Sequence, residues 1–299
     1  MYPFIDLYFI QIPTFGLMVA SAFVICHYFL KKEFKAKKLE EKILEDIIFY
    51  AALSAIIGSK IYYLIEKSLS DSGSFFSNIK DNVMCAHCDG FVEHVQNFGT
   101  GLTFNGGLIC ALIFIGIYII DQKLDFIFLA DIITPYILLG HGIGRVGCFL
   151  VGDDYGVPSD LPWAVTFSEG SPVSDVTTFT QIYNYNLNDL KAYFIEGTNY
   201  ISVHPTQLYE MSLYFISFLI IKKFYNQISK TKGLAFSLYL ILGGLSRFSV
   251  EFLRLNNRYF LDLSSAQYIS IFMIIFGLFF IFYQRKVKLF IKIFNYGKN

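Results

Sequence analysis

The sequence predicts an all-α, polytopic membrane protein. Of its 299 residues, 55% are hydrophobic and only 16% are charged, and the mean hydropathy is +0.50. This composition is too apolar for a soluble domain of the same size. We therefore expect residues 1–299 to form a single integral membrane domain.

Seven apolar stretches each approach the roughly 20 residues that cross a bilayer as a helix. They cover residues 8–30, 45–66, 103–120, 126–150, 206–224, 233–254 and 264–284. Positive charges follow the first stretch and no small-residue cleavage pattern is present, so we interpret it as a retained helix rather than a signal peptide. The polar segment at about 157–203 predicts a small extracytoplasmic head.

The basic residues indicate how the chain is oriented. If residues 31–42 are cytoplasmic, alternation of the spans also places Lys123, residues 222–232 and residues 285–298 inside. These segments hold 16 of the 24 lysines and arginines. By the positive-inside rule, we expect the N-terminus outside and the C-terminus in the cytoplasm.

A glycine-rich stretch with charged residues ends the fourth apolar span. Residues 140–156 read GHGIGRVGCFLVGDDYG, which places His141 and Arg145 four positions apart on one helix face. An arginine within a membrane helix costs roughly 2.5–3.5 kcal/mol on insertion scales. It could simply reach the lipid headgroups, but the surrounding glycines and two aspartates favour a site that holds a phosphate or a carboxylate.

Polar side chains also gather at the outer ends of the fifth and sixth spans. Gln207 and Glu210 lie three positions apart in the fifth span, and Arg247, Glu251 and Arg254 share one face of the sixth. A structural ion pair is the alternative explanation for the second group. Because these groups lie at similar depth, we predict a site near the outer leaflet that suits an anionic phospholipid.

Of the five cysteines, only Cys85 and Cys88 are close together, in a loop that the topology places outside. A disulfide and a pair of free thiols both remain open. The nearby histidines complete neither a zinc site nor a haem attachment motif. We expect no metal and no cofactor.

Four motifs resemble those of the bacterial prolipoprotein diacylglyceryl transferases, and they occur in the family's order. They are GLTFNGGL at 101–108, HGIGRVGCFLVGDDYG at 141–156, HPTQLYE at 204–210 and RFSVEFLR at 247–254. The second and third motifs are specific to the family, whereas the others alone are weak.

The resemblance implies transfer of the diacylglyceryl group of phosphatidylglycerol to the lipobox cysteine thiol of preprolipoproteins. This reaction forms a thioether and releases glycerol phosphate. The implied location is the bacterial inner (plasma) membrane, with seven spans. The expected partners are phosphatidylglycerol, preprolipoprotein signal peptides and membrane lipids, with no nucleic acid.

By motif position, Arg145 and Arg247 would hold the lipid phosphate and Glu251 would pair with Arg247. Gly156 would close the signature loop, and Asp153 stands where the family commonly has glutamate. The residues expected to act in catalysis are Arg145, Arg247, Asn105, Asp153, Glu251, His141 and His204. Those expected to bind substrate are Phe15, Lys60, Cys148, Gly156, Gln207, Tyr209, Glu210 and Arg254.

The chain departs from the family pattern at four positions. Where the family usually has tyrosine, arginine, histidine and asparagine, this chain has Phe15, Lys60, Asn105 and Cys148. The histidine is the family's candidate general base, and an asparagine amide cannot take a proton at physiological pH. We hypothesise that His141 or His204 replaces it. A strong base is dispensable if nearby arginines lower the pKa of the substrate thiol, which is ordinarily about 8.5.

Two other functions fit the same residues. A catalytically silent or altered relative would bind anionic phospholipid or lipoprotein precursors without modifying them, as the departures at Phe15 and Asn105 suggest. A transporter of an anionic solute would also bury arginines, but it should carry charges near the membrane midplane. Here the polar groups gather at the outer ends of the spans.

Overall fold

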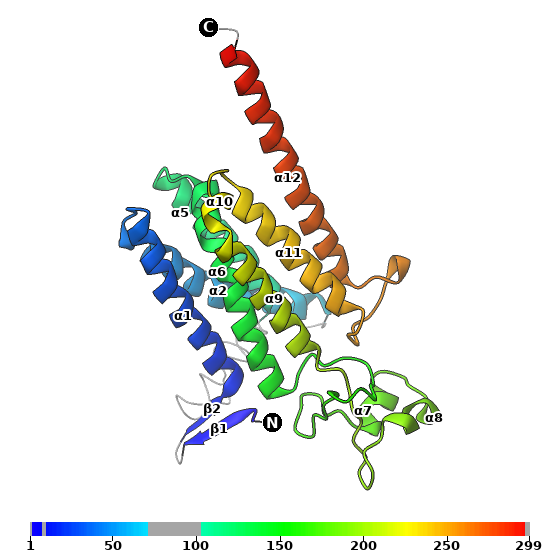
Figure 1. The fold of residues 1–299 in the computed structure, drawn as a ribbon. Coiled ribbons are helices and arrows are strands. Elements are labelled where there is room, and N and C mark those ends of the chain that lie inside the picture. Colours follow the sequence, from blue (N-terminus) through cyan, green and yellow to red (C-terminus); the bar gives the residue numbers. More distant parts are fainter. Residues whose placement is uncertain (1, 8–9, 71–102, 297–299) are drawn as a thin grey trace. The chain divides into compact units, whose positions relative to one another are not determined.

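The computed structural model describes residues 2–7, 10–70 and 103–296, most of which lie in helices (Figure 1). The chain divides into two compact units, one formed by Met1–Leu30 with Ile127–Asn299 and the other by Lys31–Phe126. The loop that holds Cys85 and Cys88 lies outside the described residues.

Two long helices, α2 (Glu41–Ser70) and α5 (Phe104–Asp121), pack against each other in the second unit. Gly58 and Gly106 lie where the two helices meet. A Cβ on Gly106 would stand 2.4 Å from the Gly58 carbonyl oxygen, so only glycine allows this approach. Close contact of helix backbones at small residues is typical of helix pairs in membranes.

The first unit begins with a short antiparallel hairpin, β1 (Phe4–Leu7) and β2 (Ile10–Pro13), which leads into α1 (Thr14–Ala36). The helix therefore starts later than the predicted span at residues 8–30. Hydropathy does not distinguish an apolar strand from the first turn of an apolar helix. The side chains of α1 pack against α6 (Phe126–Val151), where a Cβ on Gly147 would stand 3.1 Å from the Met18 Cβ.

The remaining long helices of this unit are α9 (Thr206–Lys223), α11 (Leu234–Glu251) and α12 (Ser265–Tyr296), and the short helix α10 (Tyr225–Ile228) follows α9. α11 packs against both α9 and α12. A buried cluster joins α6, α9, α10 and α11 through Leu138, Tyr214, Ile221, Tyr225, Ile228 and Ala235. Most of this cluster lies at the C-terminal end of α9 and the start of α11, opposite the ends that carry the polar motifs, so it sets how these helices pack along their length.

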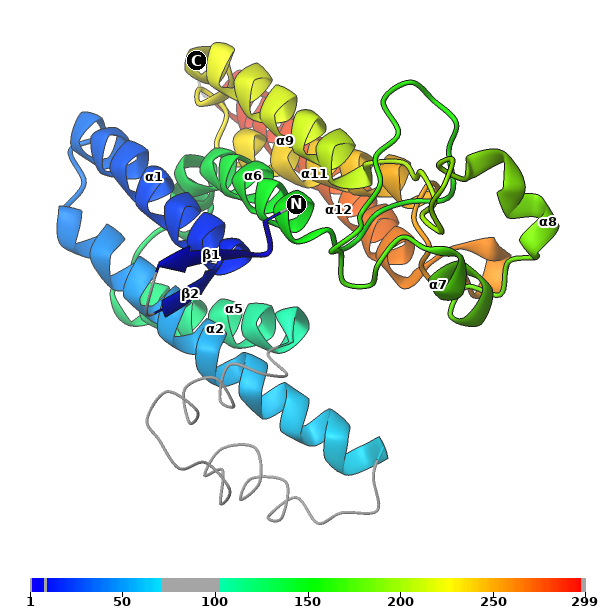
Figure 2. The same cartoon turned by 90° about the horizontal axis from the view of Figure 1, so that it is seen from below.

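The polar segment between α6 and α9 folds into a small head (Figure 2). It contains α7 (Val176–Gln181), α8 (Leu187–Leu190) and a 3-10 helix, Lys191–Tyr193. Its own buried core is formed by Tyr155, Phe167, Phe179, Leu190, Ile201 and Val203. The side chain of Asp175 caps α7 by accepting a hydrogen bond of 2.8 Å from the Thr178 backbone N–H.

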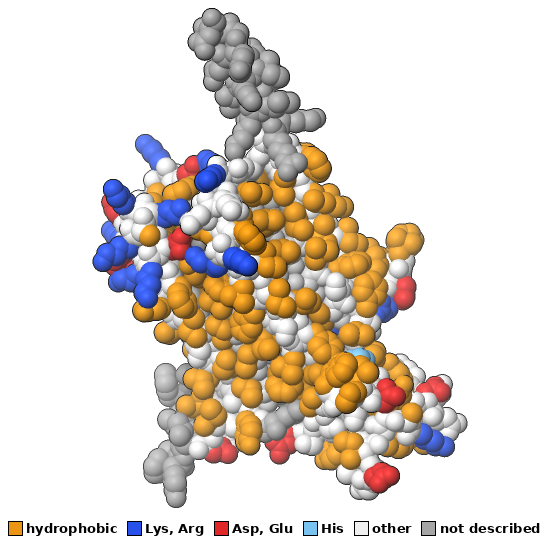
Figure 3. All heavy atoms as spheres, viewed as in Figure 1, with side chains coloured by type: hydrophobic (Ala, Val, Ile, Leu, Met, Phe, Trp, Pro, Cys, Tyr) orange, Lys and Arg blue, Asp and Glu red, His pale blue; other side chains and the backbone are white. Residues whose placement is uncertain are grey.

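Among the residues that the structure describes, five helices are long and apolar enough to cross a membrane. They are Thr14–Ala36, Glu41–Ser68, Phe126–Val151, Leu234–Glu251 and Ser265–Gln284, and Gly106–Asp121 is a shorter apolar helix. Figure 3 shows hydrophobic side chains over the outward faces of α11 and α12, where Phe272 and Phe279 are exposed. The predicted class of all-α membrane protein is therefore confirmed, whereas the count of seven spans stays a prediction.

Candidate active site

Three arginines converge on one buried carboxylate, that of Glu210 in the first turns of α9. The nearest Glu210 oxygen, Oε2, lies 2.9 Å from Arg145 Nε, 3.2 Å from Arg247 Nη1 and 3.8 Å from Arg254 Nη1. The Glu210 side chain is only 1% exposed. Arg145 comes from α6 and Arg247 from α11, and Arg254 lies just beyond α11, so Glu210 ties three segments of the first unit together.

Two further carboxylates complete the cluster. Asp154 accepts a hydrogen bond of 2.8 Å from Arg145 Nη1 and also forms an ion pair with Arg254. Glu251 Oε2 lies 3.1 Å from Arg247 Nη2 and 3.6 Å from Arg254 Nε. Three guanidinium groups therefore face three carboxylates, which offsets the cost of burying each charge.

The arginines differ in how accessible they are. The side chains of Arg145 and Arg247 are 18% and 23% exposed, whereas that of Arg254 is only 5% exposed. A guanidinium carries five N–H donors in a planar fork, and the contacts above use only some of them. Arg145 and Arg247 can therefore bind an added anion, while Arg254 holds the carboxylates in place.

Three polar side chains support the cluster and were not predicted. The Tyr214 hydroxyl donates to Glu210 Oε1 at 2.9 Å. Asn256 Nδ2 and Ser264 Oγ donate to Glu251 Oε1 at 2.6 Å and 2.8 Å. Only Tyr214 has a local signal, because it lies one helical turn after Glu210.

The loop after α6 is held by its backbone. Gly152 adopts a left-handed conformation with φ 76°, which ends the helix. The Thr206 hydroxyl donates to the Asp154 carbonyl oxygen at 2.6 Å, and the Gln207 side-chain amide donates to the Asp153 carbonyl oxygen. Gln207, predicted to bind substrate, therefore anchors the loop that presents the two aspartates.

Gly156 joins this loop to the segment after α11. Its N–H donates to the His204 carbonyl oxygen at 2.9 Å, and the next N–H, that of Val157, donates to the Leu253 carbonyl oxygen at 2.8 Å. A Cβ on Gly156 would stand 2.5 Å from the Leu253 carbonyl oxygen. Only glycine allows the two strands of backbone to approach this closely, which gives the signature glycine a structural reason.

Asp153 and Asp154 are adjacent but lie in opposite electrostatic environments. Burial disfavours the charge of Asp154, but the guanidiniums of Arg254 and Arg145 outweigh it and hold the pKa of Asp154 below its usual value. Burial and the charge of Asp154 raise the pKa of Asp153 above its usual value, against a hydrogen bond with the Cys148 thiol. Asp154 is therefore the charged partner of the arginines, and Asp153 takes up a proton more readily than Asp154.

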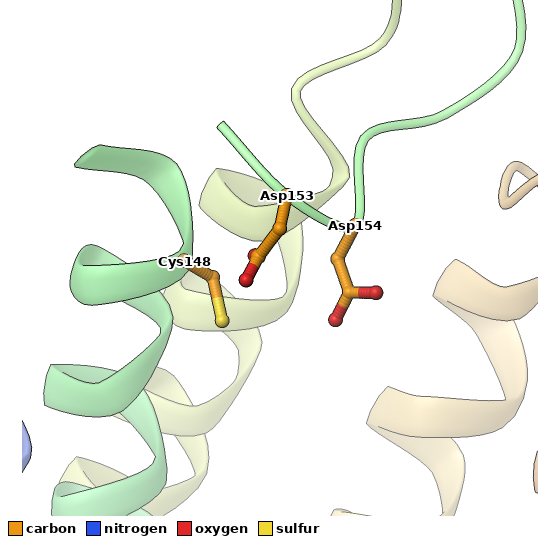
Figure 4. A group of neighbouring side chains, drawn as sticks. All are labelled: Cys148, Asp153 and Asp154. Carbon is orange, nitrogen blue, oxygen red and sulfur yellow. The ribbon is translucent and has the colours of Figure 1, made fainter. Parts of the chain in front are cut away.

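Figure 4 shows the Asp153 carboxylate turned toward the Cys148 sulfur, with the Asp154 side chain beside them. Their nearest ligand-type atoms all lie within 4.8 Å. The Cys148 sulfur also accepts a hydrogen bond of 3.4 Å from Arg145 Nη1. The positive charges of two arginines beside Asp154 repel a metal ion, so we interpret these three residues as part of the arginine site.

The two candidate histidines are placed differently. The His141 ring lies 5.2 Å from the Tyr214 ring, which borders the cluster through Glu210. His204 Nδ1 lies 3.2 Å from the Tyr209 hydroxyl, which also accepts a hydrogen bond of 2.7 Å from Trp163 Nε1. Burial lowers the pKa of His204, against the attraction of Asp160. Tyr209 thus fixes His204 at the edge of the head.

The remaining predicted residues lie in two places. Phe15, in the first turn of α1, is 43% exposed and packs near Gly147. Lys60 is buried in α2 and Asn105 lies in the first turn of α5, so both belong to the second unit. Their part in the arginine site stays a prediction.

These features define a helical membrane protein with a cluster of arginines and carboxylates, largely buried, at the ends of its helices. Residues 3–283 match the family model of prolipoprotein diacylglyceryl transferase. The chain therefore belongs to the prolipoprotein diacylglyceryl transferase family, and the resemblance of its motifs is confirmed.

Individual relatives agree over nearly the whole length. The phosphatidylglycerol–prolipoprotein diacylglyceryl transferase of Prochlorococcus marinus subsp. pastoris is 32% identical over 297 residues, covering 94% of this chain and 91% of the relative. The enzymes of the same name from Finegoldia magna and Clostridium tetani are 30% and 29% identical over 90% and 92% of this chain, and the matches cover 89% and 94% of those relatives.

Proposed function

We propose that the chain transfers the diacylglyceryl group of phosphatidylglycerol to the lipobox cysteine thiol of preprolipoproteins. The thiol sulfur attacks the terminal glyceryl carbon, the carbon–oxygen bond to phosphate breaks, and glycerol phosphate leaves. Family membership supports this reaction. The observation that carries it is the pair of partly exposed guanidiniums, Arg145 and Arg247, held by the buried carboxylate of Glu210.

The charge change of the reaction explains why two fixed arginines are needed. The phosphate of the lipid is a diester with a single negative charge, whereas a phosphate monoester carries about −1.5 to −2 at pH 7. Negative charge therefore grows on the departing phosphate. Guanidiniums that are already oriented bind the transition state, in which this charge develops, more tightly than they bind the starting lipid. This difference lowers the barrier of the transfer.

The same site geometry supports the predicted topology. α6 and α11 end at the site and α9 begins there, whereas Lys222, Lys223, Lys230 and Lys232 lie at the opposite end of α9 and before α11. By the positive-inside rule, the lysine end is cytoplasmic. The proposal therefore includes seven spans, with α5 and α9 among them, an N-terminus outside the bacterial inner membrane and a head on the outer side.

A transfer assay tests the function. The purified chain in detergent is mixed with phosphatidylglycerol and a peptide that carries a signal sequence and a lipobox cysteine. Mass spectrometry should show one added diacylglyceryl group, and a peptide with serine in place of cysteine should show none. A folded chain that binds phosphatidylglycerol without forming the adduct would instead support a silent relative, and anion uptake into proteoliposomes would support a transporter.

Replacing the arginines tests the proposed site. Arg145→Ala and Arg247→Ala should each abolish transfer, because each removes donors that hold the developing charge. The matched control is Arg258→Ala, since Arg258 donates to the backbone carbonyls of Asp262 and Phe252 and its side chain binds none of the cluster's carboxylates among the described contacts. Full transfer by both site variants would contradict the proposal.

A further inference from the structure

The transfer releases one proton from the cysteine thiol, and this proton needs an acceptor. Within the described part of the chain, the carboxylates of Asp154, Glu210 and Glu251 are each ion-paired with arginines. The guanidiniums already engage these three carboxylates, so none of them is left open to an incoming thiol. Asp153 is the remaining carboxylate at the site.

The position of Asp153 leaves an acceptor atom unused. Its Oδ1 atom is buried and has no hydrogen-bond partner among the residues that the structure describes. Buried polar atoms are ordinarily hydrogen-bonded, and an exception in a native site calls for an explanation such as a catalytic role. The backbone of Asp153 is held by the Gln207 amide, so the carboxylate is presented from a fixed point.

Asp153 also lines a hollow beside the arginine cluster. The other residues with polar side chains that line it are Asp154, Tyr155, Ser171, Tyr183, Arg254 and Asn256. A group that enters the hollow would lie beside Asp153 and one of the cluster's guanidiniums. The Cys148 sulfur lies within 4.8 Å of an Asp153 carboxylate oxygen, so a thiol can come close to this acceptor.

We propose that Asp153 is the general base that takes the proton from the lipobox cysteine thiol. The S–H proton passes to the Asp153 carboxylate as the sulfur–carbon bond forms, and the electron pair of the broken carbon–oxygen bond leaves with the phosphate. Arg145 and Arg247 receive that charge. This inference rests on the proposed transferase function.

The surroundings of Asp153 fit this role. The charged and titratable groups that face it are Cys148, Asp154, Tyr155, Tyr183, Arg145 and Arg254. Burial and the charge of Asp154 make the ionised carboxylate less favourable and so a stronger base, while the pKa of Asp154 moves in the opposite direction. Two neighbouring carboxyl groups with divergent pKa values are a recurring pattern in acid–base catalysis.

The histidines serve this purpose less well. The recorded hydrogen bond of the His204 ring is to Tyr209, at the edge of the head. The His141 ring packs against Tyr214 within α6 and α9. By contrast, the carboxylate of Asp153 lies within 4.8 Å of the Cys148 sulfur that Arg145 contacts.

The test compares two nucleophiles in the transfer assay. Asp153→Asn should lower transfer to the cysteine peptide by about 10²- to 10⁴-fold, the usual contribution of a general base. In a peptide with selenocysteine at the same position, the selenol ionises well below neutral pH, so transfer to this peptide needs no base. With this peptide, Asp153→Asn should lower the transfer rate by less than about tenfold relative to the wild-type chain. Glu169→Gln, an exposed carboxylate in the head, is the matched control.

The outcomes separate the inference from the function on which it rests. A wild-type chain that modifies neither peptide contradicts the proposed function itself. A wild-type chain that is active, with Asp153→Asn equally active or equally impaired on both peptides, overturns the role of Asp153 as base.

A second variant keeps the inference testable if Asp153→Asn does not fold. Asp153→Glu should retain transfer and shift the acid limb of the pH profile of kcat/KM, because the base must be ionised to accept the proton. In the wild-type chain, this limb should lie above the ordinary aspartate pKa of about 3.9. An acid limb that is identical in both proteins would contradict the proposal.

Discussion

At the scale of single residues, Glu210 organises the site more than its neighbours do. It was predicted to bind substrate, yet it is almost completely buried and contacts three arginines and Tyr214. Its charge keeps three guanidiniums close together in an apolar environment. Without it, their mutual repulsion would not be balanced, because only Asp154 and Glu251 would remain.

Replacing Glu210 tests this assignment. Glu210→Gln keeps the shape of the side chain but removes the shared negative charge. Breaking a buried ion pair by removing one partner typically costs about 3–5 kcal/mol. We expect a clear fall in the thermal unfolding temperature in detergent together with loss of transfer.

The control for this variant is Glu169→Gln, which makes the same chemical change at an exposed position in the head. It should leave both the unfolding temperature and transfer unchanged. If Glu210→Gln behaved in the same way, Glu210 would not be the centre of the arginine cluster.

Sequence patterns predicted the charged residues that meet in the cluster, but neither how they pair nor the supporting residues Tyr214, Asn256 and Ser264. The i, i+4 spacing of Arg247 and Glu251 allows that contact to be inferred, because both lie on one helix face. The contacts of Arg145 with Glu210 and of Arg254 with Asp154 join segments far apart in the chain. No local pattern specifies such pairs, since they depend on how α6, α9 and α11 pack.

At the scale of elements, the site depends on the junction between the loop after α6 and the exit of α11. The Gly156 N–H donates to the His204 carbonyl oxygen just before α9, and the junction itself is the hydrogen bond from the Val157 N–H to the Leu253 carbonyl oxygen. It lies directly before Arg254, which reaches back to Asp154. The junction therefore determines whether the aspartates and the arginines meet.

Gly156→Ala should disrupt this junction. The added Cβ would meet the Leu253 carbonyl oxygen at 2.5 Å and the Thr206 Cγ2 atom at 2.7 Å, and the backbone oxygen has little freedom to move. We expect transfer to fall by more than about tenfold, as displacement of catalytic groups by about 1 Å can cost 10²-fold.

Gly144→Ala in α6 is the matched control, because an added Cβ there meets nothing within 4 Å. Alanine favours a helix over glycine by roughly 1 kcal/mol, so this variant should fold at least as well as the wild-type chain. Equal transfer by Gly156→Ala and Gly144→Ala would show that the junction does not position the site.

Another connection between elements could not be inferred from sequence. Asp131 in α6 accepts hydrogen bonds from the backbone N–H groups of Gly233 and Phe236 at the start of α11. In the sequence, Asp131 is an isolated charge within an apolar span. Nothing near it indicates that it caps a helix that begins about 100 residues later. Its partner follows from helix packing alone.

At the scale of the whole molecule, composition and apolar runs were enough to predict the all-α membrane class and the approximate helix positions. They did not predict the hairpin β1–β2 or the separate core of the head. The hairpin is apolar, and the head's core residues are scattered among polar ones. Hydropathy averages over both patterns and therefore misses them.

The count of seven spans depends on α9 in particular. α9 has 18 residues and includes Glu210, Lys222 and Lys223, which lower its apolar character. Glu210 is neutralised by arginines, and the two lysines lie in its last turn, where they can reach the headgroups. The charges of α9 are therefore compatible with a helix that spans the membrane.

Reporter fusions in a bacterial host test this topology. A green fluorescent protein joined after residue 299, or after residue 230 between α9 and α11, should fluoresce, because both ends are expected in the cytoplasm. Alkaline phosphatase joined after residue 197 in the head should be active, since that enzyme requires an oxidising compartment for its disulfides. If α9 did not cross, the fusions after residues 197 and 230 would report the same side of the membrane. That result would contradict the proposal that the arginine site faces the outer side of the membrane. The positive-inside argument for that side depends on the lysines at the end of α9 opposite the site.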